Sequence, residues 1–247
     1  MSHELTKPSV RLSAAAEMAA AALSCEKKTF RALDVGCDHA KLAVYLVQSG
    51  LFSHVTASDV ADGPCEKARQ TVRERTLKGE SLEKHITVVK SDGLCGFENE
   101  HFDCIFILGM GGELISDILQ KGSFTRCEEN REKIRFILQP MTSEDKLREY
   151  LYKNGYRIDD EKMVCDKSRV YAILSVCFDG EKRKGTKSEY LLGKANIERR
   201  TDLFERQLDR RIRITKKALE ERLQNGLESD ELKTLLDELL SIKENLK

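Results

Sequence analysis

Short apolar runs alternate with helix-forming stretches through the first 155 residues, and this alternation restricts the fold more than any other feature of the chain. Strand-like runs cover 32–35, 54–60, 86–92, 102–109 and 133–140. Helix-like stretches cover 12–24, 40–49, 64–78, 112–120 and 143–154. Strands separated by helices predict a parallel sheet with helices on both faces. The last two runs are apolar almost throughout, as expected of strands buried on both faces.

Beyond Gly155 the pattern changes to two strand-like runs around a short polar turn. These runs are RIDDEKMVCD at 157–166 and RVYAILSVCFDG at 169–180. Such a pair predicts a β-hairpin, which would add antiparallel strands to one side of the parallel sheet. We therefore predict an α/β fold, with a doubly wound, seven-stranded, Rossmann-like sheet formed by a first domain of residues 1–180.

A second domain is predicted over 181–247, after a linker at GEKRKGTK, residues 180–187. Two helical segments, about 188–224 and 228–246, are separated by Asn225-Gly226. Apolar side chains recur at alternating steps of three and four in both segments, which is the heptad pattern of a coiled coil. They are Leu208, Ile212, Thr215 and Leu219 in the first, and Leu232, Leu235, Leu239, Ile242 and Leu246 in the second. We predict an antiparallel coiled-coil hairpin.

Charge is unevenly distributed in this second domain, although the whole chain is balanced at 42 Lys and Arg against 42 Asp and Glu. Residues 181–217 contain 13 Lys and Arg and 6 Asp and Glu, a net of +7, whereas 218–247 have a net of −4. A solvated helix face explains many charged helices. The density of this basic cluster also fits the electrostatic footprint of a polyanion-binding surface. Its members are Arg199, Arg200, Arg206, Arg210, Arg211, Arg213, Lys216 and Lys217.

The eight cysteines are scattered, and no two have the C-x-x-C spacing of a structural metal site. In a chain of this length we interpret them as reduced thiols of a cytoplasmic protein, and we expect no metal. No apolar run is long enough to span a membrane, and residues 1–30 lack the compact hydrophobic region of a signal peptide. We therefore expect no membrane partner.

The loop after the first predicted strand carries the most specific chemistry. It runs Asp34-Val-Gly-Cys-Asp-His-Ala40. A dinucleotide loop has three glycines at G-x-G-x-x-G, so that a pyrophosphate can approach the backbone. Here only Gly36 is present, and acids occupy the phosphate region, which disfavours NAD. Asp34 and Asp38 instead suit S-adenosylmethionine, whose sulfonium and ammonium groups are cationic. The alternative for Asp38 is a helix cap.

Two further predicted strands also end in acids. Asp59 ends the second strand, where a carboxylate accepts hydrogen bonds from both ribose hydroxyls of a bound nucleoside. Ser91-Asp92-Gly93 ends the third strand, where an acid commonly lies beside an adenine. Turn chemistry is the alternative explanation for each acid alone. Three successive strands ending in acids favour a nucleoside site.

The fourth strand ends in Leu108-Gly-Met-Gly-Gly112, which indicates the type of acceptor. Methylation of exocyclic amines of bases commonly uses an Asn/Asp-Pro-Pro-Tyr run here, and that run is absent. Formation of 5-methylpyrimidines needs a cysteine nucleophile. Pro64-Cys65 follows the second strand, where we interpret it as helix-start chemistry. The glycine-rich turn leaves room for a flat ring, and a tight turn into the next helix is the alternative.

Four motifs in order give the chain a resemblance to a known family. They are Pro8-x-Val-Arg-Leu12, Asp34-x-Gly-x-Asp-His-Ala40, Gly109-Met-Gly-Gly-x-Leu-Ile115 and Leu138-Gln-Pro140. With the helical C-terminal segment, they resemble the TrmK family of bacterial tRNA methyltransferases, of the class I type. The resemblance implies methyl transfer from S-adenosylmethionine to N1 of adenine 22 in the D-arm of tRNA. Lys41 and Ala43 depart from the aromatic residue and the proline common in the family.

The resemblance and the loops together give the expected site residues. Cofactor contacts are expected from Asp34, Gly36, Asp38, His39, Asp59, Val60, Asp92, Gly93, Gly109 and Met110. At the reaction centre we expect Asp38, His39 and Met110. RNA contacts are expected from Lys7, Arg11, Gln139, Pro140, Arg199, Arg200, Arg206, Arg210, Arg211 and Arg213.

Two other functions remain as alternatives. A class I methyltransferase could act on a small molecule or a protein, with the C-terminal hairpin as a dimerisation element or lid. A non-catalytic RNA-binding protein could use the same scaffold, although such a protein has no need of three acids. We expect a monomer, with a dimer through the helical hairpin as the alternative.

Overall fold

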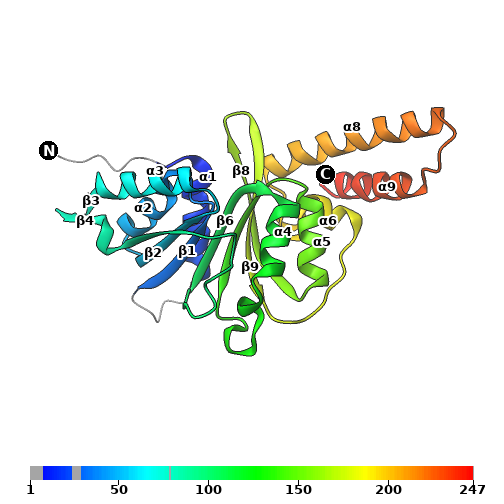
Figure 1. Ribbon diagram of the computed structural model, residues 1–247. Helices are drawn as coiled ribbons and strands as arrows, with labels where there is room; N and C mark the ends of the chain where they lie inside the picture. The colour runs from blue at the N-terminus through cyan, green and yellow to red at the C-terminus, as the bar shows by residue number, and fades with distance from the viewer. Residues whose placement is uncertain (1–7, 24–28, 78, 247) are drawn as a thin grey trace.

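The computed structural model describes residues 8–23, 29–77 and 79–246, so Lys7 and Cys25 lie outside the described residues. Its main element is a seven-stranded sheet in the order β5-β2-β1-β6-β7-β9-β8 (Figure 1). The strands are β1 (Phe30–Val35), β2 (Phe52–Asp59), β5 (Ile86–Lys90), β6 (Cys104–Gly111), β7 (Arg135–Thr142), β8 (Tyr156–Asp166) and β9 (Arg169–Phe178). The first five are parallel, and β9 runs antiparallel to both β7 and β8. The predicted doubly wound sheet with a terminal hairpin is confirmed.

Helices cover both faces of this sheet because successive strand residues point to opposite faces. Ala32 packs into a cluster with α1 (Val10–Ala22), α2 (Lys41–Gln48) and α3 (Asp62–Arg73). Its neighbour Leu33 packs on the other face, into a cluster with the two further helices α4 (Gly112–Lys121) and α5 (Glu144–Lys153). The same alternation explains why residues 105–108 of β6 and 136–138 of β7 are apolar without interruption.

The helix predicted over 64–78 is too long, because α3 ends at Arg73. A small antiparallel ribbon follows, formed by β3 (Thr76–Leu77) and β4 (Glu80–Ser81). Gly79 lies in its turn with a φ of +85°, a conformation that glycine adopts without strain. This turn chemistry replaces the last turn of the expected helix.

The single helix predicted over 188–224 is wrong, because the chain forms three helices there: α6 (Lys187–Leu192), α7 (Lys194–Arg199) and α8 (Asp202–Gln224). Gly193 separates α6 from α7 and has a φ of +85°. A Cβ added there would lie 1.8 Å from a carboxylate oxygen of Glu161. Arg200 takes a left-handed conformation before Thr201, whose side chain caps α8. The close approach to Glu161 therefore requires the glycine and ends the helix.

The C-terminal hairpin consists of α8 and α9 (Asp230–Glu244), which project from the sheet side by side (Figure 1). Phe204, Leu208 and Ile212 of α8 form one apolar cluster with Leu239 of α9. This cluster includes apolar residues from both predicted heptad patterns, so the expected contact between the two helices is present. The coiled-coil geometry stays a prediction.

A buried ion pair fixes α6 to the sheet. The Arg148 guanidinium donates to a Glu161 carboxylate oxygen at 2.7 Å and to the Tyr190 carbonyl at 2.7 Å. Both charged side chains are nearly inaccessible, with exposed fractions of 3% and 1%. Removing one partner of such a pair leaves a buried charge unpaired, which is strongly unfavourable.

The division into domains 1–180 and 181–247 stays a prediction.

Replacing Phe204 with alanine should lower the free energy of unfolding by about 3–5 kcal/mol. The side chain is fully buried at the centre of the cluster that joins α8 to α9, so its removal leaves a cavity. Chemical denaturation measures the loss. Leu223→Ala is the matched control on the same helix, because Leu223 is 52% exposed and should change stability by about 0.5 kcal/mol or less. Equal losses for the two variants would contradict this packing.

The described residues contain no group of three or more His, Cys, Asp or Glu side chains placed to hold a metal ion. The seven cysteines in this part of the chain are all free. A membrane crossing would need a longer and more apolar helix than any that the structure describes.

Candidate functional site

A cavity of about 760 Å³ opens at the carboxyl ends of the parallel strands. Ligands of open α/β sheets bind at this edge, and the volume lies within the range of small-molecule sites. Four groups of residues line it: Asp34, Gly36, Cys37 and Asp38 at the end of β1 and after it; Asp59 at the end of β2; Leu108, Gly109 and Met110 in β6; and Gln139 and Met141 in β7. Pro8, Ser9, Arg11 and Leu12 close it from the start of α1, and Lys41, Leu42, Val44, Tyr45, Gln48, Thr71 and Arg75 close it from α2 and beyond.

The loop after β1 is held in an unusual backbone conformation. Gly36 has a φ of +74°, and its N–H donates to the Ser58 carbonyl at 2.8 Å. Asp38, His39 and Ala40 also have positive φ values, of 21°, 63° and 55°. Non-glycine residues in such conformations store strain, which concentrates at functional sites. The loop therefore has the character of a ligand-binding loop, and α2 begins only at Lys41.

Gly36 also makes room for Met110. A Cβ added at Gly36 would lie 2.2 Å from Met110 Cε, which is well inside van der Waals contact. The methionine side chain therefore packs directly over the glycine loop and forms one wall of the cavity. This contact joins the two predicted cofactor loops, after β1 and at the end of β6, in one site.

Asp34 is the most unusual acid of this site. Its side chain is buried, and its Oδ2 has no hydrogen-bond partner among the described residues. Its pKa is raised to about 7, chiefly by burial and less by the nearby carboxylates of Asp38 and Asp59, while a hydrogen bond from the Ala43 backbone lowers it. A buried, unpartnered carboxylate beside two other acids favours binding of a cation.

Asp59 lies across the cavity at the end of β2. Its Oδ1 accepts a hydrogen bond from the Ala61 N–H at 3.0 Å, which turns the chain into α3. Its second carboxylate oxygen has no partner in the described part of the chain, and the residue lines the cavity. This geometry leaves a charged acceptor available to a ligand hydroxyl.

The raised pKa of Asp34 predicts a pH dependence of stability. The unfolded carboxyl ionises near its ordinary pKa of 3.8 and the folded one near 7, so the folded state binds the proton more tightly. The resulting stability is fully present below pH 3.8 and is lost as pH rises through 7. The stability of Asp34→Asn relative to wild type should therefore rise with pH, from little difference at pH 4 to a gain of about 1–3 kcal/mol at pH 8, in denaturant titrations without ligand. Parallel pH profiles for the two proteins would contradict the assignment.

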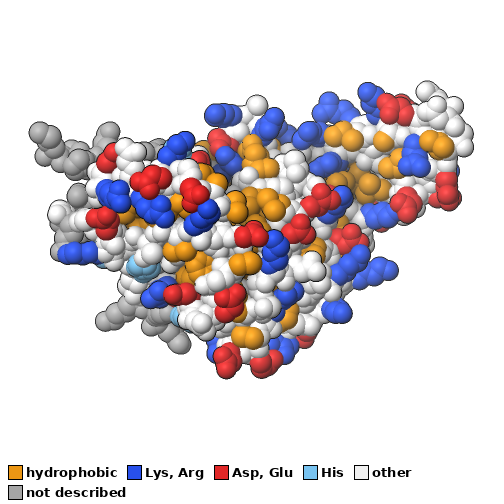
Figure 2. Space-filling model, viewed as in Figure 1, with side chains coloured by type: hydrophobic (Ala, Val, Ile, Leu, Met, Phe, Trp, Pro, Cys, Tyr) orange, Lys and Arg blue, Asp and Glu red, His pale blue; other side chains and the backbone are white. Residues whose placement is uncertain are grey.

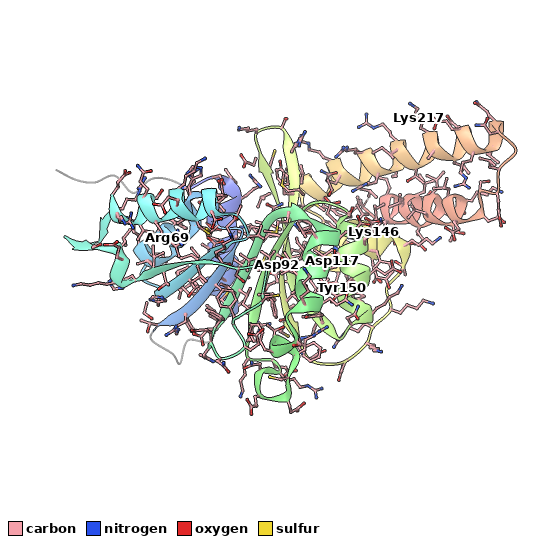
Figure 3. All side chains as sticks on the ribbon, in the orientation of Figure 1. Arg69, Asp92, Asp117, Lys146, Tyr150 and Lys217 are labelled. Atoms are coloured by element: carbon pink, nitrogen blue, oxygen red, sulfur yellow. The ribbon has the colours of Figure 1, made fainter. Side chains whose placement is uncertain are left out.

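Four predicted cofactor residues are not brought into the cavity wall. His39 pairs with Asp38 at 3.4 Å beside the loop, and the Val60 side chain is 62% exposed. Asp92 forms an ion pair with Lys121 of α4 at 2.8 Å and lies over that helix (Figure 3). Gly93 packs near α4 as well.

The predicted RNA contact Arg11 has internal partners. Its guanidinium donates to Gln139 Oε1 at 2.9 Å, pairs with Asp166 at 3.1 Å and stacks 4.8 Å above the Tyr171 ring. Gln139 is buried and donates in turn to the Pro140 carbonyl at 2.7 Å. Arg11 and Gln139 therefore form a fixed polar wall of the cavity, whereas the Pro140 side chain is not part of it.

The basic residues predicted for one helix divide into two groups. Arg206, Arg210 and Arg213 are exposed on α8 and make no hydrogen bond or ion pair with any described residue. Figure 2 shows Lys and Arg side chains along the upper edge over this helix, and Lys217 points away from the molecule in Figure 3. Arg211 instead pairs with Glu144 of α5 at 3.3 Å.

Arg199 and Arg200 lie outside α8, contrary to their predicted place on its basic face. Arg199 ends α7 and bonds Asp160 and the Glu161 carbonyl. Arg200 follows α7 and donates to the Asn245 carbonyl. The break after α7 turns both side chains toward the protein.

Several residues that form or support the cavity were missed from the sequence. Ser58 is fully buried, and its carbonyl also accepts from the Cys37 N–H at 3.0 Å, so it fixes the glycine loop. Lys41, Tyr45 and Gln48 face the cavity from α2. Their steps of four and three on an otherwise apolar helix were a signal that the sequence contained. Backbone acceptors such as Ser58 have no such signal.

A family model described as TrmK: tRNA (adenine(22)-N(1))-methyltransferase matches residues 32–244. The tRNA (adenine(22)-N(1))-methyltransferase of Bacillus subtilis strain 168 is 36% identical over 141 residues, which cover 57% of this chain. The matched segment spans 56% of that relative, little more than half of its length.

Two solved structures are similar over nearly the whole chain. The crystal structure of the B. subtilis M1A22 tRNA methyltransferase TrmK has a TM-score of 0.75 and 28% identity, covering 98% of this chain and 99% of that chain. Streptococcus pneumoniae Sp1610, in complex with S-adenosyl-L-methionine, has a TM-score of 0.75 and 30% identity, covering 98% of this chain and 100% of that chain.

Proposed function

Because this chain belongs to the TrmK family, we propose that it is an S-adenosylmethionine-dependent methyltransferase that methylates N1 of adenine 22 in the D-arm of tRNA. The observation that carries the proposal is the buried, unpartnered carboxylate of Asp34, which lies with Asp38 and Asp59 around one cavity at the carboxyl ends of the strands. This acidic arrangement fits a cationic nucleoside and disfavours a pyrophosphate.

The cavity has groups suited to the cationic and the ribose parts of the cofactor. Asp34 and Asp38 would hold the cationic methionine end beside the loop that Gly36 opens. Asp59 would accept hydrogen bonds from the ribose hydroxyls through its unpartnered oxygen. Val60 follows Asp59 and is exposed outside the cavity wall, and it stays a predicted cofactor contact. When bound, S-adenosylmethionine supplies the methyl group to be transferred.

The protein's part in the reaction is mainly alignment and electrostatics. Adenine N1 has a free lone pair, so no residue needs to remove a proton before attack. The methylated base is cationic, and the Asp38 carboxylate, 79% exposed at the cavity, can stabilise this charge. Met110 and Gln139 would form walls for the base, with the Gln139 amide held by Arg11. His39 is placed to bond Asp38 rather than to act as a base.

Binding of tRNA is proposed for the exposed basic face of α8. N1 lies on the pairing edge of adenine, so the base must leave its helix to enter the cavity. Arg206, Arg210 and Arg213 would hold the phosphate backbone while the base is extruded. We propose a monomer, because the apolar residues of α8 are covered by α9 within one chain. The cytoplasmic location stays a prediction.

Transfer of labelled methyl from S-adenosylmethionine to an unmodified bacterial tRNA transcript tests this function. We expect label in the tRNA and 1-methyladenosine as the labelled nucleoside. Cofactor binding without label in any tRNA would contradict the tRNA assignment and favour a small-molecule or protein substrate. Binding of tRNA without cofactor binding would favour a non-catalytic RNA-binding protein.

A further inference from the structure

The β8–β9 hairpin extends beyond the rest of the sheet. β9 pairs with β7 only over Leu174–Cys177, whereas its pairing with β8 continues to Asp166 and Arg169. The outer part of the hairpin therefore stands beyond β7, and Figure 1 shows its tip rising beside the start of α8. Both α1, which closes the cavity, and α8, which carries the exposed arginines, contact β8.

The carboxylates of β8 are all engaged in ion pairs, whereas the cations at its tip are not. Asp159 pairs with Arg135 and Arg157, Asp160 with Arg199, Glu161 with Arg148 at 2.7 Å, and Asp166 with Arg11 at 3.1 Å. Lys167 and Arg169 are exposed and make no ion pair with any residue that the structure describes. Asp166 lies opposite Arg169 across the hairpin, but it is already paired with Arg11, so the two cations of the tip have no ion-pair partner among the described residues.

The tip is also linked directly to the cavity wall. Asp166, immediately before Lys167, holds the Arg11 guanidinium, which donates to Gln139 in the cavity. Tyr171 of the same hairpin lies beneath that guanidinium. An anion bound at the tip would therefore lie between the cavity and the basic face of α8.

We propose that the tip of this hairpin, Lys167 and Arg169, is a second RNA-binding element that contacts the phosphodiester backbone next to the extruded nucleotide. The inference rests on the proposed function and extends it from α8 to the cavity mouth. Charge complementarity supports it, since two unpaired cations face the path that a polyanion must take between these two sites. Contacts of this kind position the RNA without reading its sequence.

The turn itself allows removal of charge without damage to the fold. Lys167 has a φ of 58°, a left-handed conformation that glycine adopts more readily than lysine. Lys167→Gly should therefore maintain or raise thermal stability. Arg169→Gln completes a double variant that lacks both cations. A fall in RNA affinity in this variant could not be attributed to unfolding.

The test compares tRNA binding by the full-length double variant and by a matched control. We expect tRNA Kd to rise about tenfold at physiological salt, and the slope of log affinity against log salt to fall by about 2. S-adenosylmethionine affinity should be unchanged. The control is Lys133→Gln with Lys182→Gln, because both lysines are exposed and lie near the opposite ends of the strands, before β7 and after β9. It should bind tRNA as wild type does.

Three results would contradict the inference in distinguishable ways. Wild-type affinity and salt slope in the tip variant would overturn the role of the tip alone. An equal loss in the control would show a general charge effect and would also overturn it. Absence of tRNA binding by the wild-type protein would overturn the proposed function on which the inference rests.

Discussion

Reversing the charges of Arg206, Arg210 and Arg213 to glutamate should weaken tRNA binding by about 100-fold or more at moderate salt. The three guanidinium groups are exposed on α8 and have no partners in the described part of the chain, so they are available to phosphates. Each reversal removes an attraction and adds a repulsion. Because α8 is not part of the cavity wall, S-adenosylmethionine affinity should stay at its wild-type value.

Filter binding at several salt concentrations measures the effect, and calorimetry measures cofactor affinity. Arg211 is left unchanged, since its pairing with Glu144 would confound RNA binding with the docking of α8. The matched control reverses Lys133, Lys182 and Lys184, three exposed lysines that make no ion pair with any described residue and lie outside the cavity wall. Unchanged tRNA affinity in the α8 variant would remove this helix from the substrate surface.

Replacing Asp59 with alanine should weaken S-adenosylmethionine binding by about 100-fold, equivalent to about 2.7 kcal/mol. The carboxylate can accept hydrogen bonds from both ribose hydroxyls, and hydrogen bonds to a charged group contribute about 1.5–3 kcal/mol each. Asp59 lies in the cavity wall with one oxygen unpartnered. Affinity for tRNA should change little, because no proposed phosphate contact involves this strand end.

Two further variants separate charge from local structure at this position. Asp59→Asn retains an oxygen that can accept from the Ala61 N–H, so it preserves the turn while removing the charge. We expect a loss between those of wild type and Asp59→Ala. Asp62→Ala removes an acid that pairs with Lys90 outside the cavity, and it should bind the cofactor normally. Wild-type cofactor affinity in Asp59→Ala, measured by calorimetry, would contradict the ribose assignment.

The sheet was predictable because its signal is local and repeated. Apolar strand runs alternate with amphipathic helices, and residues 105–108 of β6 and 136–138 of β7 are apolar without interruption because helices cover both faces. The expected helix over 188–224 was wrong because its break depends on a contact distant in sequence. Gly193 lies against Glu161 of β8, and the helical periodicity of residues 188–224 cannot predict this contact with a distant strand. The Thr186–Glu189 capping box was a local signal only for the start of a helix there.

Site residues could be predicted from the sequence where they end strands that are neighbours in the sheet. Asp34 and Asp59 meet because β1 and β2 are neighbours in the sheet. Asp92 follows β5, the edge strand, and its side chain pairs with Lys121 of α4 instead of lining the cavity. Arg11 was predicted to face RNA, but a partner on β8 more than 150 positions away holds it in the cavity wall. Such long-range pairing has no signature within either segment.

Methyl transfer to a pair of transcripts tests directly whether the protein methylates adenine 22 of tRNA. One is an unmodified tRNA transcript with adenine 22, and the other is the same transcript with that adenine replaced. We expect 1-methyladenosine in the first and no methyl incorporation in the second. Equal incorporation into both transcripts would contradict adenine 22 as the target, and no incorporation into either would contradict tRNA as the substrate.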